Sequence, residues 1–526
     1  MKLTDYHSYA DAQAHFSAEA LWALFDGDRA AFNIAHECVD RHADSGRTAL
    51  IIIHAEGEDE IISYRELARL SARFAHWLQD QGIAPGDRVA VMLEPSLAFY
   101  VAVFGALKAG AIAVPMFTLF GPEALDLRLR DCEPRLLIHD GHSAASRHDL
   151  GGTRGVHFDA QLLRALQGFP EHFEVRTSAA DLAVYQYTSG TTRELPEAVR
   201  HAHRTLVTLM VAALYGTGIR PGERFLCPSS PAWGHGLWHG TFAPLALGLT
   251  VGSYAGKFDA ERLLQALQTH RFDNLSAAAT HYRMLRNCAR VTEYSHALRK
   301  LSFTGEPMDP DTASFVRQHF GLEACSMYGT TELGVVLVNY PGAADYTVKS
   351  GSLGRPPPAM VVEVQHEDGS PCAIDETGFL MVQRRGQWVP TRDLARQDAD
   401  GHYFHGGRAD DVIISAGWTM SAVEIENAIL GHPDVLEAAA IGVADPLRGE
   451  VVKAFVVSAR PADETFAEEI QQRVKSRLSL HEYPRQVAFV GALPKTPAGK
   501  VNRRVLREAE RAGQADPTLS SSASPT

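Results

Sequence analysis

The sequence predicts an α/β fold, with a large N-terminal domain of parallel-rich sheets covered by helices and a small, mobile α+β domain at the C-terminus. Three observations favour this class. Short apolar runs suited to central strands alternate with helical segments through most of the chain. A polar, glycine-rich stretch at residues 406–411 interrupts this rhythm, and a smaller unit follows it. A length of 526 residues also exceeds what one core supports.

The expected elements of the large domain follow from hydrophobic periodicity. Residues 64–81 place their apolar side chains on one helical face, which predicts an amphipathic helix. A continuous apolar strand is expected at 88–93 and a mostly apolar helix at 96–109. The short apolar runs at 136–139 and 182–187 are typical of further central strands.

The small domain is expected to begin at the glycine-rich stretch. Ser421 and Glu424 form a capping box that opens a helix ending near Gly431. Strands at 435–443, 451–457 and 486–490 and a helix over 466–478 complete the unit. We therefore predict domains at 1–407 and 408–512, and a disordered tail at 513–526, which lacks core-forming residues.

Composition excludes several classes of protein. The chain is 45% hydrophobic and 21% charged, as in ordinary soluble proteins, and its formal charge of −13 argues against nucleic-acid binding. Its six cysteines form no CxxC pair, which suits a reducing compartment and argues against a disulfide frame or a structural zinc site. Residues 1–20 lack the apolar core of a signal peptide. The most hydrophobic stretch, residues 89–116, is interrupted by charged residues and prolines. We expect no integral membrane segment and a cytoplasmic location.

A phosphate-binding loop is predicted after the strand at 182–187. Thr188, Ser189, Gly190, Thr191 and Thr192 are small, and such residues let successive backbone N–H groups turn inward to form an anion site. Taken alone, such a run after a strand is more often a plain turn.

Further motifs resolve the ambiguity, because with them the chain resembles the adenylate-forming superfamily from about residue 32 to residue 507. This superfamily comprises acyl-CoA synthetases, nonribosomal adenylation domains and luciferases. The motifs stand in the family's order: the loop at 188–192 with His201 and His203, Gly305-Glu306-Pro307, Tyr328-Gly329-Thr330-Thr331-Glu332, Asp393, the segment 407–411, and the segment 494–500. The resemblance implies an ATP-dependent acid–thiol ligase that forms an acyl-adenylate and then an acyl-CoA.

Nucleotide-binding residues follow from the resemblance. It implies that the loop holds the phosphates, Tyr328 stacks on adenine and Asp393 accepts the ribose hydroxyls, as a carboxylate does well. A core tyrosine is the alternative for Tyr328. The nucleotide set is Thr188, Ser189, Gly190, Thr191, Thr192, Gly305, Glu306, Pro307, Tyr328, Gly329, Asp393 and Arg408.

The resemblance also assigns catalytic roles. Lys500 bridges the carboxylate and the α-phosphate, where an ammonium offsets the repulsion of two anions. Thr331 contacts the α-phosphate, and Glu332 binds Mg²⁺, which favours carboxylate oxygens. Asp410 is the hinge about which the small domain rotates. The alternatives are a helix-start glutamate for Glu332 and a turn aspartate for Asp410.

The acyl pocket is expected at Trp233, His235 and Ala278. The surrounding sequence segments, including Lys257-Phe258-Asp259 and residues 282–285, are most similar to those of medium-chain or aryl acyl-CoA synthetases. A medium-chain fatty or aromatic monocarboxylic acid is therefore the expected substrate, although Trp233 is equally typical of a core residue.

Three departures from the family pattern leave rival functions open. Arg193 and Glu197 alter the phosphate loop, Arg392 replaces a usual glycine, and Thr419 replaces a basic residue. One rival loads a carrier-protein phosphopantetheine in place of CoA, and the other is a catalytically impaired nucleotide-binding regulator. ATP, Mg²⁺, CoA and a carboxylic acid are the expected cofactors and partners, with a carrier protein as a possible further one.

Overall fold

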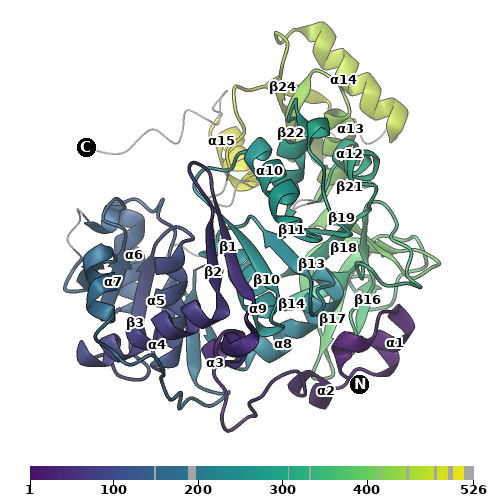
Figure 1. The fold of residues 1–526 in the computed structure, drawn as a ribbon. Helices are drawn as coiled ribbons and strands as arrows, with labels where there is room; N and C mark the ends of the chain where they lie inside the picture. Colours follow the sequence, from purple (N-terminus) through teal and green to yellow (C-terminus); the bar gives the residue numbers. More distant parts are fainter. Residues whose placement is uncertain are drawn as a thin grey trace.

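The computed structural model describes residues 1–146, 150–187, 197–305, 307–330, 333–409, 412–415, 418–445, 449–478, 483–495 and 501–513. These residues form two large sheets with helices around them, a smaller antiparallel sheet and a separate C-terminal unit (Figure 1).

The first large sheet has eight strands and carries most of the candidate site. Its strands run parallel except for β2 and β14 at the two edges. In spatial order they are β14 (Gly334–Val338), β13 (Ala324–Thr330), β12 (Lys300–Thr304), β11 (Asn274–Ala278), β9 (Arg224–Cys227), β10 (Thr250–Ala255), β1 (Thr48–His54) and β2 (Glu60–Ser63).

The second large sheet has six strands, parallel except for β8. Their order is β6 (Arg154–His157), β5 (Leu136–His139), β3 (Arg88–Met92), β4 (Ile112–Pro115), β7 (Leu182–Gln186) and β8 (Val199–Ala202). The predicted strands at 88–93, 136–139 and 182–187 are therefore confirmed.

One hydrophobic core joins the two sheets. It combines buried residues of β1, β3, β9 and β10 with those of the central helices, so the large sheets fold as one body. Helix α5 is buried on almost every side, which explains why its sequence is apolar throughout. The helices of this region are α1 (Tyr9–Ala14), α2 (Ala18–Trp22), α3 (Ile34–Cys38), α4 (Tyr64–Asp80), α5 (Leu97–Lys108), α6 (Pro122–Cys132), α7 (Ala160–Leu166), α8 (Thr205–Ala212), α9 (Ala243–Ala246), α10 (Ala260–His270), α11 (Ala279–Arg286) and α12 (Pro310–Phe320).

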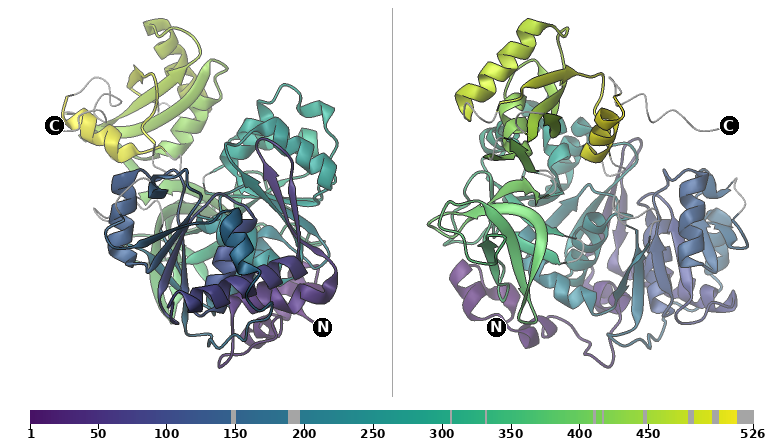
Figure 2. Two further views of the ribbon diagram at one scale, coloured as in Figure 1. Left: turned by 60° about the vertical axis from the view of Figure 1, so that its left-hand side comes forward. Right: turned by 180° about the vertical axis from the view of Figure 1, so that it is seen from behind.

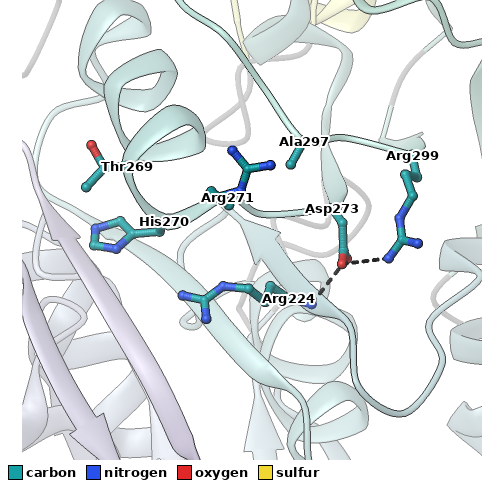
Figure 3. Close-up of a pocket in the computed structure, with 7 residues that line it drawn as sticks. All are labelled: Arg224, Thr269, His270, Arg271, Asp273, Ala297 and Arg299. Atoms are coloured by element: carbon teal, nitrogen blue, oxygen red, sulfur yellow. Dashed lines mark hydrogen bonds and ion pairs between the residues drawn. The ribbon is translucent and has the colours of Figure 1, made fainter.

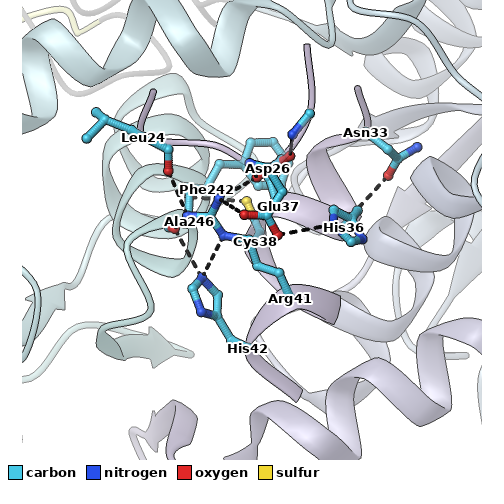
Figure 4. A network of polar contacts seen from close by, with 11 residues as sticks. Leu24, Asp26, Asn33, His36, Glu37, Cys38, Arg41, His42, Phe242 and Ala246 are labelled. Carbon is cyan, nitrogen blue, oxygen red and sulfur yellow. Dashed lines mark hydrogen bonds and ion pairs between the residues drawn. The ribbon is translucent and has the colours of Figure 1, made fainter. Parts of the chain in front are cut away.

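A polar network ties α3 to the helical segment that begins at His235 (Figure 4). The fully buried Glu37 accepts a hydrogen bond of 2.6 Å from Arg41, whose other Nη donates to the carbonyls of Leu24 and Ala246. Cys38 contacts the carbonyl of Phe242 in the same segment. Because both charges are paired and hydrogen-bonded, the cost of burying them is compensated. The network thereby fixes the helical segment against α3.

The antiparallel sheet follows β14 in the chain and was not anticipated as a separate layer. It brings Asp393, on β18, to the candidate site. Its order is β15 (Ser352–Gly354), β19 (Tyr403–Arg408), β18 (Gln387–Gln397), β17 (Gly378–Arg384) and β16 (Val362–Gln365).

The C-terminal unit lies at one end of the large body, at the top of both views in Figure 2. Its strands are β21 (Trp418–Ser421), β20 (Val412–Ser415), β23 (Gly449–Ser458), β22 (Val435–Asp445) and β24 (Gln486–Phe489), and its helices are α13 (Ala422–Leu430), α14 (Glu464–Arg477) and α15 (Arg503–Arg511). The predicted elements and the predicted fold class are confirmed. The residues after 513, predicted to be a disordered tail, lie outside the described residues. Among the described helices, none has the length and apolarity needed to cross a bilayer.

Candidate active site

Four of the predicted site residues gather at one edge of the eight-stranded sheet. Strands β9, β11, β12 and β13 are parallel, so their carboxyl ends lie at the same edge. Trp233 follows β9, Ala278 ends β11, Gly305 follows β12 and Tyr328 lies near the end of β13. In α/β proteins this edge is where ligands bind.

On the side predicted to bind the nucleotide, Tyr328 and Asp393 are in direct contact. The tyrosine hydroxyl donates a hydrogen bond to the carboxylate of Asp393, which is only 5% exposed. Nε2 of His405 lies 3.6 Å from the same carboxylate. The residue predicted to stack on adenine and the residue predicted to hold the ribose are therefore neighbours, although they are 65 positions apart in the chain.

The backbone around Asp393 is unusual. Its N–H donates to the hydroxyl of Thr391, which in turn donates to the carbonyl of Leu380. Arg392 between them has a φ of 67°, in the left-handed region that glycine adopts without cost. The usual glycine of the family motif therefore has a conformational reason, and Arg392 occupies a strained position.

Trp233 lies beside the turn at Gly305. A side chain at position 305 would begin 3.4 Å from Cη2 of Trp233. The indole therefore stands between the turn predicted to approach the purine and the region predicted to hold the acid. This position agrees with a role as a wall of the acyl pocket, although Trp233 is also half-buried, as a core residue can be.

On the side predicted to bind the acid, His235 links two segments of the sheet edge. It opens a π-helix (His235–Phe242), and its ring nitrogens contact the hydroxyls of Ser229 and Ser276 at 2.9 Å each. Gly236 permits this packing, because a Cβ there would lie 2.3 Å or less from the carbonyls before it. Because both ring nitrogens are engaged, His235 can offer the acid a surface but no free hydrogen-bonding group.

The imidazoles of this region are uncharged near neutral pH. Burial lowers the pKa of His235 well below its ordinary value, with smaller contributions from His239 and His281. Burial also lowers the pKa of His239, His281 and His201 to about 4 in each case. The region therefore presents polar but neutral rings.

Ala278, predicted to line the acyl pocket, is the most exposed of three successive alanines. Ala277 and Ala279 are fully buried in the core, whereas Ala278 is partly exposed. Ala278 is also the N-cap residue of α11, and its N–H donates to Nδ1 of His281. A larger side chain at 278 would project from the open edge, next to a neutral imidazole.

Several predicted site residues lie outside the described residues: Thr188, Ser189, Gly190, Thr191, Thr192, Glu306, Thr331, Glu332, Asp410 and Lys500. Pro307 and Gly329 are exposed at the site edge, and Arg408 lies opposite Asp393 on β19. The roles of all these residues remain predictions.

Two contributors were missed in the sequence. His405 approaches Asp393 from the neighbouring strand, and Gln186 at the end of β7 accepts a hydrogen bond from Trp238. The Nε2 of Gln186 is buried without a hydrogen-bond partner among the described residues. His405 was detectable only through the β18–β19 pairing, which no local pattern encodes.

A cavity of about 640 Å³ lies at the opposite, amino-terminal edge of the same strands (Figure 3). Arg224, Arg271 and Arg299 line it around Asp273. Arg299 pairs with Asp273 at 2.9 Å, and the three guanidinium groups point in different directions. Because they do not converge on one point, this cavity is not a candidate catalytic site.

The sequence profile of the AMP-binding enzyme family matches residues 38–389, and that of the AMP-binding enzyme C-terminal domain matches residues 424–500. The chain belongs to the AMP-binding enzyme family. Membership confirms the predicted resemblance to adenylate-forming enzymes and the predicted enzyme class, an AMP-forming acid–thiol ligase.

Relatives match over nearly the full chain. An uncharacterized acyl-CoA ligase of Bacillus subtilis is 28% identical over 91% of this chain and 96% of its own. The crystal structure of an acyl-CoA synthetase from Brucella canis superposes with a TM-score of 0.73 at 30% identity, covering 96% of this chain and 99% of that one. A benzoate CoA ligase from Burkholderia xenovorans gives 0.77 at 28% identity, covering 91% and 100%. Neither the carrier-protein alternative nor the regulator alternative gains support from these relatives.

Proposed function

We propose that this enzyme is an ATP-dependent acid–CoA ligase for a monocarboxylic acid with an uncharged tail, of the aromatic or medium-chain class. The observation that carries the substrate class is the neutral acyl side of the site. Burial holds the pKa of His201, His239 and His281 at about 4, so these rings supply no cation for a second carboxylate. The likeness to a benzoate CoA ligase supports an aromatic acid.

The nucleotide side supports ATP as the second substrate. A carboxylate accepts several hydrogen bonds at once, which suits Asp393, next to Tyr328, to the proposed role of ribose acceptor. The tyrosine ring is fixed by that bond, which prepares it to stack on adenine. Glu332 would hold Mg²⁺, which would neutralise part of the phosphate charge.

In the first half-reaction, a carboxylate oxygen of the acid attacks the α-phosphorus of ATP. A bond forms between that oxygen and phosphorus, and the bond to the β-phosphate oxygen breaks, releasing pyrophosphate. Lys500 is assigned to the meeting point of the two anions, where its ammonium group offsets their repulsion. Thr331 would donate its hydroxyl to the α-phosphate.

In the second half-reaction, the thiol sulfur of CoA attacks the acyl carbon. The thioester bond forms as the bond to AMP breaks, and the thiol proton leaves to solvent. We propose that the C-terminal domain turns about Asp410 between the two steps, so that Lys500 serves only the first.

A panel of acids tests the substrate class. Pyrophosphate release and acyl-CoA formation are measured with benzoate, hexanoate, octanoate, acetate, a dicarboxylate and an amino acid. Benzoate or the medium-chain acids should be used best, with a graded profile because one methylene is worth only about 1–3 kcal/mol. A sharp preference for acetate, the dicarboxylate or the amino acid would refute the substrate class.

The variant Lys500→Ala tests the division of labour. Adenylation should fall by orders of magnitude, while thioester formation from supplied acyl-AMP largely survives. Arg504→Ala, an exposed position on α15, is the matched control and should leave both half-reactions unchanged. An equal loss in both half-reactions of Lys500→Ala would contradict the assigned role.

A further inference from the structure

Three metal-binding side chains of different types meet on the connection between strands β16 and β17. A ligand atom from each of His366, Cys372 and Glu376 lies within 4.8 Å of the other two. His366 and Glu376 are exposed, and Cys372 is half-buried. This connection leaves the edge strand of the antiparallel sheet and contains none of the residues assigned to adenylation.

The backbone of this connection is ordered by its own hydrogen bonds. The N–H of His366 donates to the carbonyl of Ser370 at 2.8 Å, and the N–H of Cys372 donates to the carbonyl of Val364 at 2.9 Å. The N–H of Ala373 donates to the carboxylate of Glu376. The three ligand-bearing residues are therefore positioned before any ion arrives, which lowers the entropic cost of binding one.

The position of the thiol depends on a neighbouring glycine. A Cβ at Gly378 would lie 2.4 Å from Sγ of Cys372 and 2.7 Å from the carbonyl oxygen of Gln365. Since real Cβ atoms do not approach so closely, a larger residue at 378 would displace the thiol. The glycine at 378 thus lets Cys372 stand beside His366 and Glu376.

Negative charge surrounds the thiol. The carboxylates of Glu376, Asp368 and Glu363 interact electrostatically with this thiol. A group of carboxylates favours a cation beside them. As a metal–sulfur bond forms, the thiol proton would pass to solvent.

We propose that His366, Cys372 and Glu376 form a zinc-binding site that fastens the connection between β16 and β17. Imidazole, thiolate and carboxylate together are ligands of Zn²⁺, whereas Mg²⁺ and Ca²⁺ prefer oxygen alone. Three protein ligands leave the fourth tetrahedral position to water. The sequence argued against structural zinc because it lacks a CxxC pair, but this set needs none, since the ligands come from one folded loop.

Cobalt provides the test, because Co²⁺ replaces zinc and gives a thiolate-to-metal absorption band. The full-length, metal-free protein is titrated with Co²⁺ and then with Zn²⁺. Wild type should show the band at one ion per chain, and zinc should abolish it. Cys372→Ser should remove the band, and His366→Gln and Glu376→Gln should each weaken zinc binding. We expect each variant to bind zinc at least about 100-fold more weakly, because removing even a group that only supports a ligand costs up to about 100-fold in affinity.

Cys288→Ser is the matched control, because Cys288 is also half-buried but belongs to no such group in the described part of the chain. It should keep the band and the affinity for zinc. Zinc should also protect Cys372, but not Cys288, from alkylation. His366 and Glu376 are exposed, so their variants test the site even if Cys372→Ser fails to fold. Absence of the band in wild type, or zinc binding that the three variants leave unchanged, would show only an exposed His366–Glu376 ion pair and would overturn the proposal.

Discussion

At both edges of the eight-stranded sheet one side chain links two strands, but the linking side chain is neutral at one edge and charged at the other. At the carboxyl edge, His235 joins the end of β9 to β11 through Ser229 and Ser276. At the amino edge, Asp273 joins the start of β9 to the start of β12, accepting from the N–H of Arg224 and from Arg299. The first link is neutral and buried, whereas the second is an ion pair beside an open cavity.

The difference shows what each edge can do. The π-helix buries the His235 ring at its own first residue, so this imidazole is retained only in its neutral form. At the amino edge Arg271 and Arg299 are exposed to solvent, so these two charges are kept at little cost. Buried neutral polar groups at the carboxyl edge suit the binding of an uncharged acyl tail. Arginines at the amino edge suit stabilisation of the strand starts.

The largest expected effect separates the two edges by a matched pair of aspartates. Asp393→Ala should lower kcat/KM for ATP by about 10²–10³-fold, because the ribose would lose charge-assisted hydrogen bonds. Asp273→Ala should leave kcat/KM unchanged and lower the free energy of unfolding by about 1–3 kcal/mol. Steady-state kinetics and urea unfolding of the two variants measure both effects. A loss of activity in Asp273→Ala would break the distinction between the edges.

Stability should fall on acidification because of the buried histidines on and around the π-helix, His201 among them through its ring contact with Trp238. Burial lowers the pKa of His201, His239 and His281 in the folded state to about 4, below the unfolded value of about 6.5. The unfolded chain therefore binds more protons between these values, and the stability present above pH 6.5 is lost as the pH falls toward 4. Each such histidine should contribute about 2 kcal/mol of loss between pH 7.5 and pH 5.

Urea unfolding at the two pH values measures this loss. His239→Gln should reduce the difference between them, whereas Asp273→Ala should lower stability about equally at both. A wild-type stability that does not change between pH 7.5 and pH 5 would contradict neutral, buried imidazoles.

Ala278→Trp should sharpen the role of the carboxyl edge in selecting the acid. Since Ala278 is the partly exposed alanine of the run, the indole should fill acyl space and shift the preference toward shorter acids by about tenfold. The ratio of kcat/KM for a medium-chain acid and a shorter one measures the shift. Met284→Trp, at an exposed position of α11, is the control and should leave that ratio unchanged.

The smallest effect concerns the strained backbone beside Asp393. Arg392→Gly should raise the free energy of unfolding by about 0.5–1 kcal/mol, because glycine adopts a φ of 67° without a steric penalty. Gln383→Gly, on the exposed face of β17, should destabilise instead. A destabilised Arg392→Gly variant would show that the arginine side chain contributes more than its backbone strain costs.

The sequence predicted the fold class and the expected elements that depend on local periodicity. The helix at 64–81 and the strand at 136–139 appear within a residue of their expected ends, because apolar spacing alone determines them. It did not predict the antiparallel sheet as a separate layer, or His405 beside Asp393. Those features depend on strand pairing between distant segments, which local patterns do not encode.

The same limit applies to the histidines of the acyl side. His235 was predicted as a pocket residue from its neighbourhood in the chain, but its two serine partners come from β11 and from the segment after β9. Only the folded structure shows that its ring nitrogens are engaged. The substrate class predicted from the sequence segments at residues 257–259 and 282–285 rests on resemblance, and the panel of acids tests it.

Acid-dependent exchange of labelled pyrophosphate into ATP, measured in the absence of CoA, tests the central claim most directly. If an acyl-adenylate forms first, the best acid of the panel should support exchange without CoA, and the exchange should depend on Asp393 and not on Asp273. Exchange that requires CoA, or acid activation that converts ATP to ADP and phosphate, would contradict the account.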